Sequence, residues 1–264
     1  MPSPQFLPPL LLSSLLLTAC AGQPPQGPDG SAYPRLMQLA QDVERRGDAG
    51  TAATLYQRAT EQPDAGFDAW YRLGETRLAT GDARGAEQAF QQALGQRPED
   101  PAARLGLGTA QLRLGAASQA EPLLRDAAQA LGSATAFNRL AIANVQLGHL
   151  QAAQQAFLRA SRAAPADLDA RCNLALSYAL SGQNHQALQT VEGLDRAANV
   201  LPRQQRNVLL VRVLAGQTDA ELQTVNLERA DAQRRPALIA EARQLAAIAD
   251  TGARAAAIGW DDRR

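Results

Sequence analysis

The sequence has no lysine, so arginine supplies all of its basic side chains. These 26 basic residues balance 26 acidic residues, and the formal net charge at neutral pH is zero. A chain without net charge has no overall electrostatic field that would draw it onto nucleic acid or anionic lipid. We therefore expect no nucleic-acid partner.

Histidine and cysteine are also scarce, with two of each in 264 residues. The sequence has no glycine-rich phosphate loop, no metal-ligand spacing and no nucleophile elbow. His149 and His185 each follow a turn glycine, where we expect solvent-exposed side chains, and Cys172 is expected to pack as a small apolar residue rather than to act in redox chemistry. We expect no enzyme activity, no catalytic residue, no cofactor, no metal and no small-molecule substrate.

Aromatic residues make up only 4% of the sequence, although 45% of it is hydrophobic and roughly a fifth is alanine. Alanine is the best helix former and buries little area per residue, which favours closely packed helices. A sheet would need more valine, isoleucine, threonine and aromatic residues. The composition therefore predicts an all-α protein.

An apolar run over residues 6–19 stops directly before Cys20. It is shorter than the roughly 20 residues of a membrane-spanning helix and suits the apolar part of a secretory signal peptide. The residues Leu17-Thr18-Ala19-Cys20 resemble the lipobox of bacterial lipoproteins, although no Lys or Arg precedes the apolar run. The alternative is an ordinary signal sequence that happens to end in cysteine.

This resemblance implies that residues 1–19 are a lipoprotein signal peptide and that Cys20 is lipidated, which anchors the protein to a membrane without spanning it. Ala21 stands where an aspartate would favour retention in the inner membrane, so the expected location is the periplasmic face of the bacterial outer membrane. The remainder of residues 20–32 is rich in Pro and Gly, and we expect it to form an extended tether.

The rest of the chain repeats itself at a spacing of 33 or 34 residues. The clearest unit contains Trp70, Leu73, Gly74, Ala86, Phe90, Ala93 and Pro98. This pattern, which recurs over residues 33–217, resembles the tetratricopeptide repeat. The resemblance implies a solenoid, a right-handed superhelix of antiparallel helix pairs in which stacking between neighbouring units provides the stability.

The repeat also predicts how each unit is built. Glycines end the first helix through a left-handed turn, at Gly47, Gly81, Gly115, Gly148, Gly182 and Gly216. Small residues such as Gly74 and Ala86 allow the two helices to approach closely, and Phe90 fills the space against the next unit. We expect five repeats and a degenerate sixth over residues 33–230, a capping helix at 231–250 and a flexible tail at 251–264.

In tetratricopeptide domains the second, fifth, sixth and ninth positions of each repeat face a concave groove. Those positions give Asp68, Tyr71, Arg72 and Glu75 in an early repeat, and the predicted groove residues of the whole chain are Arg72, Asn138, Arg139, Asn173, Arg203, Arg206 and Asn207. Most of this set falls in the later repeats, where amides and guanidinium groups suit a peptide from a partner protein. The alternative is that Asn173 and Asn207 bond between neighbouring repeats.

The segment 171–182 (RCNLALSYALSG) resembles the pattern R-x-N-L-A-L-x-x-x-L-x-G of TadD-type lipoproteins, which belong to the tight-adherence (Flp) pilus system. That resemblance implies a non-enzymatic scaffold that helps a secretin or another pilus-assembly component to assemble or localise. Two alternatives are a cell-envelope adaptor that regulates peptidoglycan enzymes and a chaperone-like holder of exported proteins.

Overall fold

The computed structural model describes residues 32–258 and residue 260. The expected signal peptide, Cys20 and nearly all of the tether lie outside these residues. The described part is helical, and none of its helices is long and apolar enough to cross a membrane.

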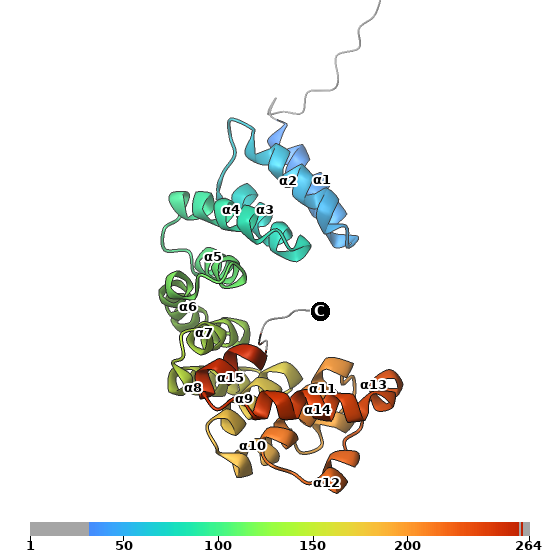
Figure 1. The fold of residues 1–264 in the computed structure, drawn as a ribbon. Helices are drawn as coiled ribbons and strands as arrows, with labels where there is room; N and C mark the ends of the chain where they lie inside the picture. Colours follow the sequence, from blue (N-terminus) through green and yellow to red (C-terminus); the bar gives the residue numbers. More distant parts are fainter. Residues whose placement is uncertain (1–31, 259, 261–264) are drawn as a thin grey trace, which may run out of the picture.

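Five antiparallel helix pairs follow one another along the chain, each packed against the next. Their bounds are α1 Tyr33–Arg45 with α2 Ala49–Thr60, α3 Phe67–Thr80 with α4 Ala83–Gln96, α5 Pro101–Arg113 with α6 Ala117–Leu131, α7 Ala134–Gln146 with α8 Leu150–Ala163, and α9 Leu168–Leu180 with α10 Asn184–Val191. Figure 1 shows these pairs stacked along a curved path. The prediction of an all-α repeat solenoid is confirmed.

The ends of the helices follow from local sequence. All six predicted turn glycines have a positive φ, for example +87° at Gly81 after α3, a conformation that glycine adopts without steric cost. Several helices begin at an aspartate whose side chain accepts a backbone N–H bond, as Asp48 does from Thr51 and Asp82 from Gly85, both at 2.9 Å. These N-caps and turn glycines fix where the helices of each pair begin and end.

Between the pairs, the aromatic position of the repeat is fully buried. Phe90 lies against two glycines of neighbouring first helices: a Cβ atom built on Gly74 would come within 2.8 Å of its ring, and one on Gly106 within 2.3 Å. The close approach at Gly74 is as predicted. The contact at Gly106 is an additional one, which lets α5 lie directly on the ring.

The sixth repeat is degenerate, as expected. Its first helix, α11, runs over Pro202–Leu214, but its second is reduced to the five residues of α12, Asp219–Gln223. A 3-10 turn, η1 at Leu194–Arg196, lies before α11 and contains the buried Asp195. The Asp195 carboxylate accepts the backbone N–H of Asn226 at 2.7 Å. This bond fixes the loop after α12.

The C-terminal region differs from the prediction in two ways. The expected capping helix is broken into α13 (Arg229–Gln233) and α14 (Arg235–Ala246), with Pro236 in the first turn of α14. The expected flexible tail is wrong over residues 251–258, which form a further helix, α15 (Thr251–Ile258). Its apolar side packs on the solenoid, where Ala255 is fully buried, so tertiary contacts order a segment too weakly apolar to be recognised from sequence.

Candidate functional site

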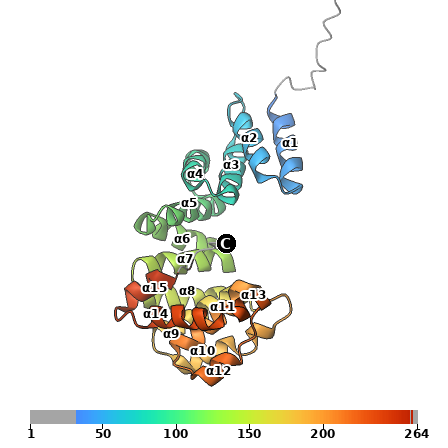
Figure 2. The same ribbon diagram turned by 45° about the vertical axis from the view of Figure 1, so that its right-hand side comes forward.

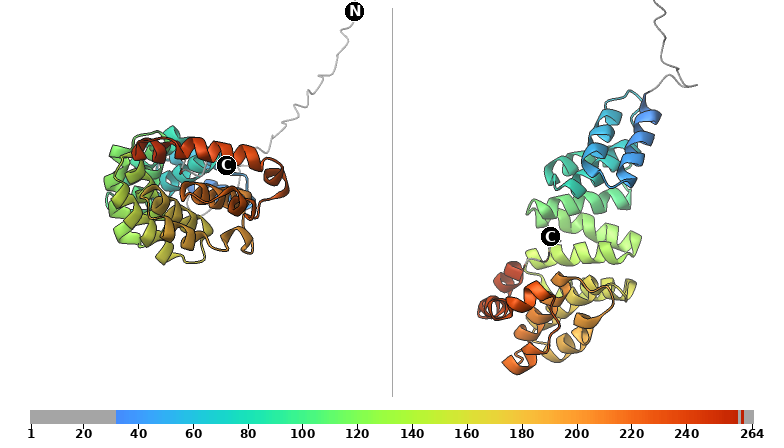
Figure 3. Two further views of the ribbon diagram at one scale, coloured as in Figure 1. Left: turned by 60° about the horizontal axis from the view of Figure 1, so that its bottom comes forward. Right: turned by 90° about the vertical axis from the view of Figure 1, so that its right-hand side faces the viewer.

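The first helices of the repeats (α1, α3, α5, α7, α9 and α11) form one row, which we call the first-helix row. α14 packs against α11, and α15 packs against α7 and α9. In Figures 1 and 2 these two C-terminal helices run back from α11 toward α7, and Figure 3 shows them beside the later repeats. The row therefore has a covered half (α7, α9, α11) and an open half (α1, α3, α5).

Most of the predicted groove residues lie in the covered half, where they bond within the protein. The Asn173 side-chain amide donates to Asn138 Oδ1 at 2.8 Å, a bond between neighbouring repeats. Arg206 donates to Asp231 Oδ2 of α13 at 2.7 Å, and Arg203 pairs with Asp169 of α9.

Arg139 on α7 and Asn207 on α11 are half-buried in the same half of the row. The expectation of an open groove in the later repeats is not met, because Asn138, Asn173, Arg203 and Arg206 bond within the protein and its C-terminal helices pack on α7, α9 and α11. For Asn173 the structure favours the alternative of a bond between repeats.

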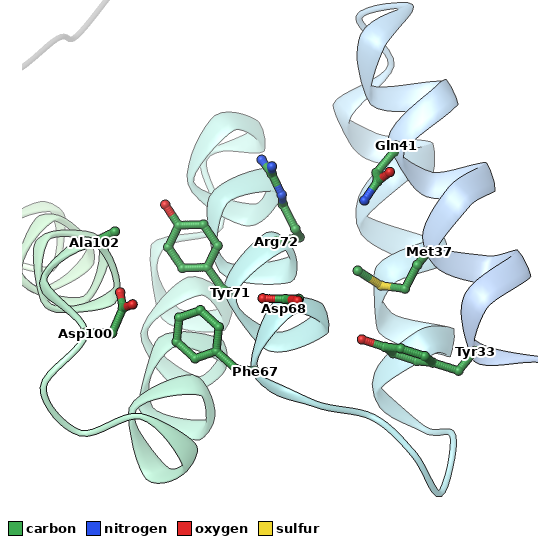
Figure 4. A pocket seen from close by; sticks show the side chains of 9 residues that line it. All are labelled: Tyr33, Met37, Gln41, Phe67, Asp68, Tyr71, Arg72, Asp100 and Ala102. Carbon is green, nitrogen blue, oxygen red and sulfur yellow. The ribbon is translucent and has the colours of Figure 1, made fainter.

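The open half contains a cavity of about 550 Å³. Its lining, drawn in Figure 4, comes from α1 (Tyr33, Met37, Gln41), from α3 (Phe67, Asp68, Tyr71, Arg72) and from the start of α5 (Asp100, Ala102). Of the seven predicted binding residues only Arg72 lies here, together with the groove positions Asp68 and Tyr71 of the same repeat. We call this cavity the N-terminal pocket.

Stacked rings hold one wall of the N-terminal pocket. Phe67 and Tyr71 stack with centroids 5.6 Å apart, and Tyr71 meets Phe90 edge to face at 5.9 Å. The guanidinium of Arg97 also lies over the Phe67 ring, 4.2 Å from the ring centroid and 3.9 Å from the Asp68 carboxylate. Because Phe90 is locked between glycines, this wall is preorganised.

The N-terminal pocket has more acidic than basic side chains in its lining. Glu75 accepts from the Tyr71 hydroxyl at 2.8 Å and from Arg72 at 3.0 Å, so it offsets the Arg72 charge. Asp68 is exposed, while Asp100 caps α5 by accepting the Ala103 N–H at 2.8 Å. The pocket therefore presents two carboxylates: Asp68, which lies 3.9 Å from Arg97 at the rim, and Asp100, whose charge the Arg72–Glu75 pair does not offset.

The two tyrosines of the pocket are both neutral, and the Tyr71 hydroxyl donates a hydrogen bond to Glu75. Burial, followed by the hydrogen bond to Glu75, raises the pKa of Tyr71 well above its usual value. Partial burial, followed by the charge of Asp68, raises the pKa of Tyr33. Both phenols therefore keep their protons at neutral pH.

The remaining reactive side chains lie away from the pocket. Cys172 is fully buried, and burial raises its pKa to about 12, so its thiol stays protonated at neutral pH. His149 and His185 are exposed, as expected. Among the described residues no group of three histidine, cysteine or carboxylate side chains could hold a metal ion.

Helix pairs at a 34-residue spacing, stacked so that their first helices form one surface, define a tetratricopeptide-repeat solenoid. The chain belongs to the family described as the cilia and flagella-associated protein 70 middle TPR-like domain, whose model matches residues 36–246. A search of curated proteins finds no match.

Solved structures with the same fold include MamA (residue 41 to the end) from Desulfovibrio magneticus RS-1, which is 20% identical with a TM-score of 0.58 and covers 63% of this chain and 97% of its own. YrrB, described as a TPR protein with an unusual peptide-binding site, is 22% identical with a TM-score of 0.52, over 69% of this chain and 89% of its own. A thermophilic TPR protein from Thermus thermophilus is 19% identical with a TM-score of 0.50, over 79% of this chain and 100% of its own. At these identities the likeness shows the fold.

Proposed function

We propose that this protein is a non-enzymatic scaffold that binds a segment of a partner protein in the N-terminal pocket. The observation that carries the proposal is the division of the first-helix row: α14 and α15 cover the later repeats, while a cavity of about 550 Å³ stays open between α1, α3 and α5. Aromatic side chains held rigidly in a hollow are typical binding hot spots, because little side-chain entropy is lost on binding.

The charges of the pocket indicate the chemistry of that segment. Asp68 and Asp100 present carboxylates; Asp68 has only a long, exposed ion pair with Arg97 at 3.9 Å, whereas Arg72 is held by Glu75 at 3.0 Å. A guanidinium or ammonium group would gain from these carboxylates and from the aromatic faces. Arg97 of this chain already makes such a pair of contacts, with the Phe67 ring and with Asp68. The proposed partner segment therefore carries a basic side chain.

In the cell, we propose that this scaffold is a lipoprotein on the periplasmic face of the outer membrane, and that it helps a secretin or another component of a tight-adherence pilus or secretion machine to assemble. The support is in the sequence: the lipobox that ends at Cys20, the tether that follows and the TadD-like segment 171–182. A scaffold that binds through the N-terminal pocket would present that pocket next to its membrane tether.

Photo-cross-linking in the producing cell tests the pocket. A photoreactive amino acid is placed at Gln41 or Ala102 in the pocket and, as a control, at the exposed Gln92 of α4. We expect one discrete adduct from the two pocket positions, weakened by Asp68→Asn with Asp100→Asn, and none from position 92. Adducts from position 92 alone would place the partner on the other row of helices and contradict the proposal.

Separate experiments test the cellular role. Labelling with an alkyne fatty acid should be lost in Cys20→Ser, and deletion of the gene should remove surface fibres and leave the secretin unassembled. A peptidoglycan hydrolase as the adduct, together with normal fibres, would instead support the adaptor alternative. Many unrelated adducts would support the chaperone-like holder.

A further inference from the structure

α15 and Trp260 lie on the covered half of the first-helix row. Ala255 is fully buried there, and Ile258 and Trp260 pack against the apolar cluster of α7, α8 and α9. The Trp260 ring stacks on Phe157 with centroids 4.9 Å apart and an interplanar angle of 18°. We call the surface beneath Ala255, Ile258 and Trp260 the aromatic niche.

The repeat positions on this face change character along the chain. The ninth position of the repeat is polar in the first three units and apolar in the next two: Gln41, Glu75, Thr109, Ile142 and Leu176. Ile142 and Leu176 are 1% and 2% exposed. The apolar surface under α14 and α15 is therefore suited to being covered by apolar side chains, whereas the polar N-terminal pocket is suited to contact with water.

The segment that covers the aromatic niche is short. α15 has eight residues, fewer than the roughly 12 to 15 that an isolated helix needs, so docking holds it in shape. Its polar side chains bond within the segment: Arg254 Nε donates to the Ile248 carbonyl at 2.8 Å, and Trp260 Nε1 to the Ala255 carbonyl at 2.6 Å. Its attachment through Ala255, Ile258 and Trp260 is apolar.

We propose that the aromatic niche between α7 and α9 is a second protein-binding site, distinct from the N-terminal pocket, which recognises a short helix of small residues followed by an aromatic side chain. α15 and Trp260 are the occupant supplied by the same chain. A partner segment of the same chemistry takes their place. Its apparent affinity is reduced because α15 and Trp260 already fill the niche in most molecules.

The test uses the full chain and a fluorescein-labelled peptide with the sequence of residues 248–260. Its binding is measured by fluorescence anisotropy to the wild type, to Trp260→Ala and to Ala255→Arg, which places a charge at a buried position. Trp260→Phe keeps an aromatic ring but loses the Nε1–H bond to Ala255, and Ala256→Ser alters an exposed residue of α15, so these two serve as controls for the apolar attachment. A second peptide has alanine in place of its tryptophan.

The proposal predicts that Trp260→Ala and Ala255→Arg bind the peptide at least tenfold more tightly than the wild type, and that both controls behave as the wild type does. The tenfold figure corresponds to a niche filled by α15 in at least nine molecules of ten. The alanine peptide should not bind. Equal binding to all five proteins, binding to none, or loss of the helical circular dichroism in the two opened variants would overturn the proposal.

Discussion

Replacing Gly106 by alanine tests the contact between the second and third repeats. The new methyl group would lie 2.3 Å from Phe90 Cζ and 2.4 Å from Cε1, whereas carbon atoms in contact are about 3.5 Å apart. The ring has no room to retreat, because Phe90 is fully buried and also lies against Gly74, where an added Cβ would come within 2.8 Å. The backbone of α5 must therefore move away by about 1 Å.

Two opposing effects set the magnitude. Overpacking of this kind costs about 1 to 3 kcal/mol, and the rigid surroundings place Gly106→Ala near the upper end. Alanine gains about 1 kcal/mol over glycine in a helix, so the net loss should be about 2 kcal/mol. Gly95→Ala in α4 is the matched control: an added Cβ meets nothing within 4 Å there, so only the gain of about 1 kcal/mol remains.

Urea unfolding followed by circular dichroism at 222 nm measures both variants. Repeat arrays depart from two-state unfolding, so the direction of each midpoint shift is the decisive quantity. Gly106→Ala should lower the midpoint and Gly95→Ala should raise it. Adding Phe90→Leu should relieve the clash, with a favourable coupling energy of at least about 1 kcal/mol in a double-mutant cycle. A Gly106→Ala variant as stable as Gly95→Ala, or a coupling energy near zero, would refute the packing described here.

Three further predictions concern single side chains. Asp82→Ala removes the N-cap of α4 and should cost about 1 kcal/mol in urea unfolding, while Asp82→Asn should keep most of the stability. The hydrogen bonds from Thr51 lower the pKa of Asp48 in the folded protein. The Asp48 carboxylate therefore stabilises the fold above its unfolded-state pKa of about 3.9, and this stabilisation is lost as the pH falls through the lower folded-state pKa. Asp48→Asn should lack this pH-dependent loss of stability in acid unfolding. The Cys172 thiol, buried and with its pKa raised to about 12, should react with a disulfide reagent at pH 8 only after the protein is unfolded in urea.

The repeat architecture could be predicted from sequence because its determinants are local and recur. Turn glycines, close-packed alanines and Phe90 each return at one spacing, so the helix pairs and their contacts follow from the pattern. The cover formed by α15 could not be predicted in the same way. Its partners in α7 lie more than 100 residues earlier, and an alanine-rich face carries little hydrophobic signal of its own.

The candidate site was predicted in part for the same reason. The groove positions of the repeat include Asp68, Tyr71 and Arg72, which line the N-terminal pocket; their role in binding stays a prediction. The later repeats were not found as a covered surface, because sequence alone does not show that Asn173, Arg203 and Arg206 bond within the protein or that α14 and α15 pack on α7, α9 and α11. A signal was present at the other end: Tyr33 and Phe67 are 34 residues apart and begin two successive units with an aromatic ring.

Hydrogen exchange of the protein with and without its cross-linked partner tests the central claim most directly. We expect slower exchange in α1, α3 and the first turns of α5 when the partner binds, with α2, α4 and α6 unchanged. The Asp68→Asn, Asp100→Asn double variant should show less protection, while Asp126→Asn, which removes a carboxylate on α6, should match the wild type. Protection confined to α2, α4 and α6 would contradict the assignment of the N-terminal pocket as the binding surface.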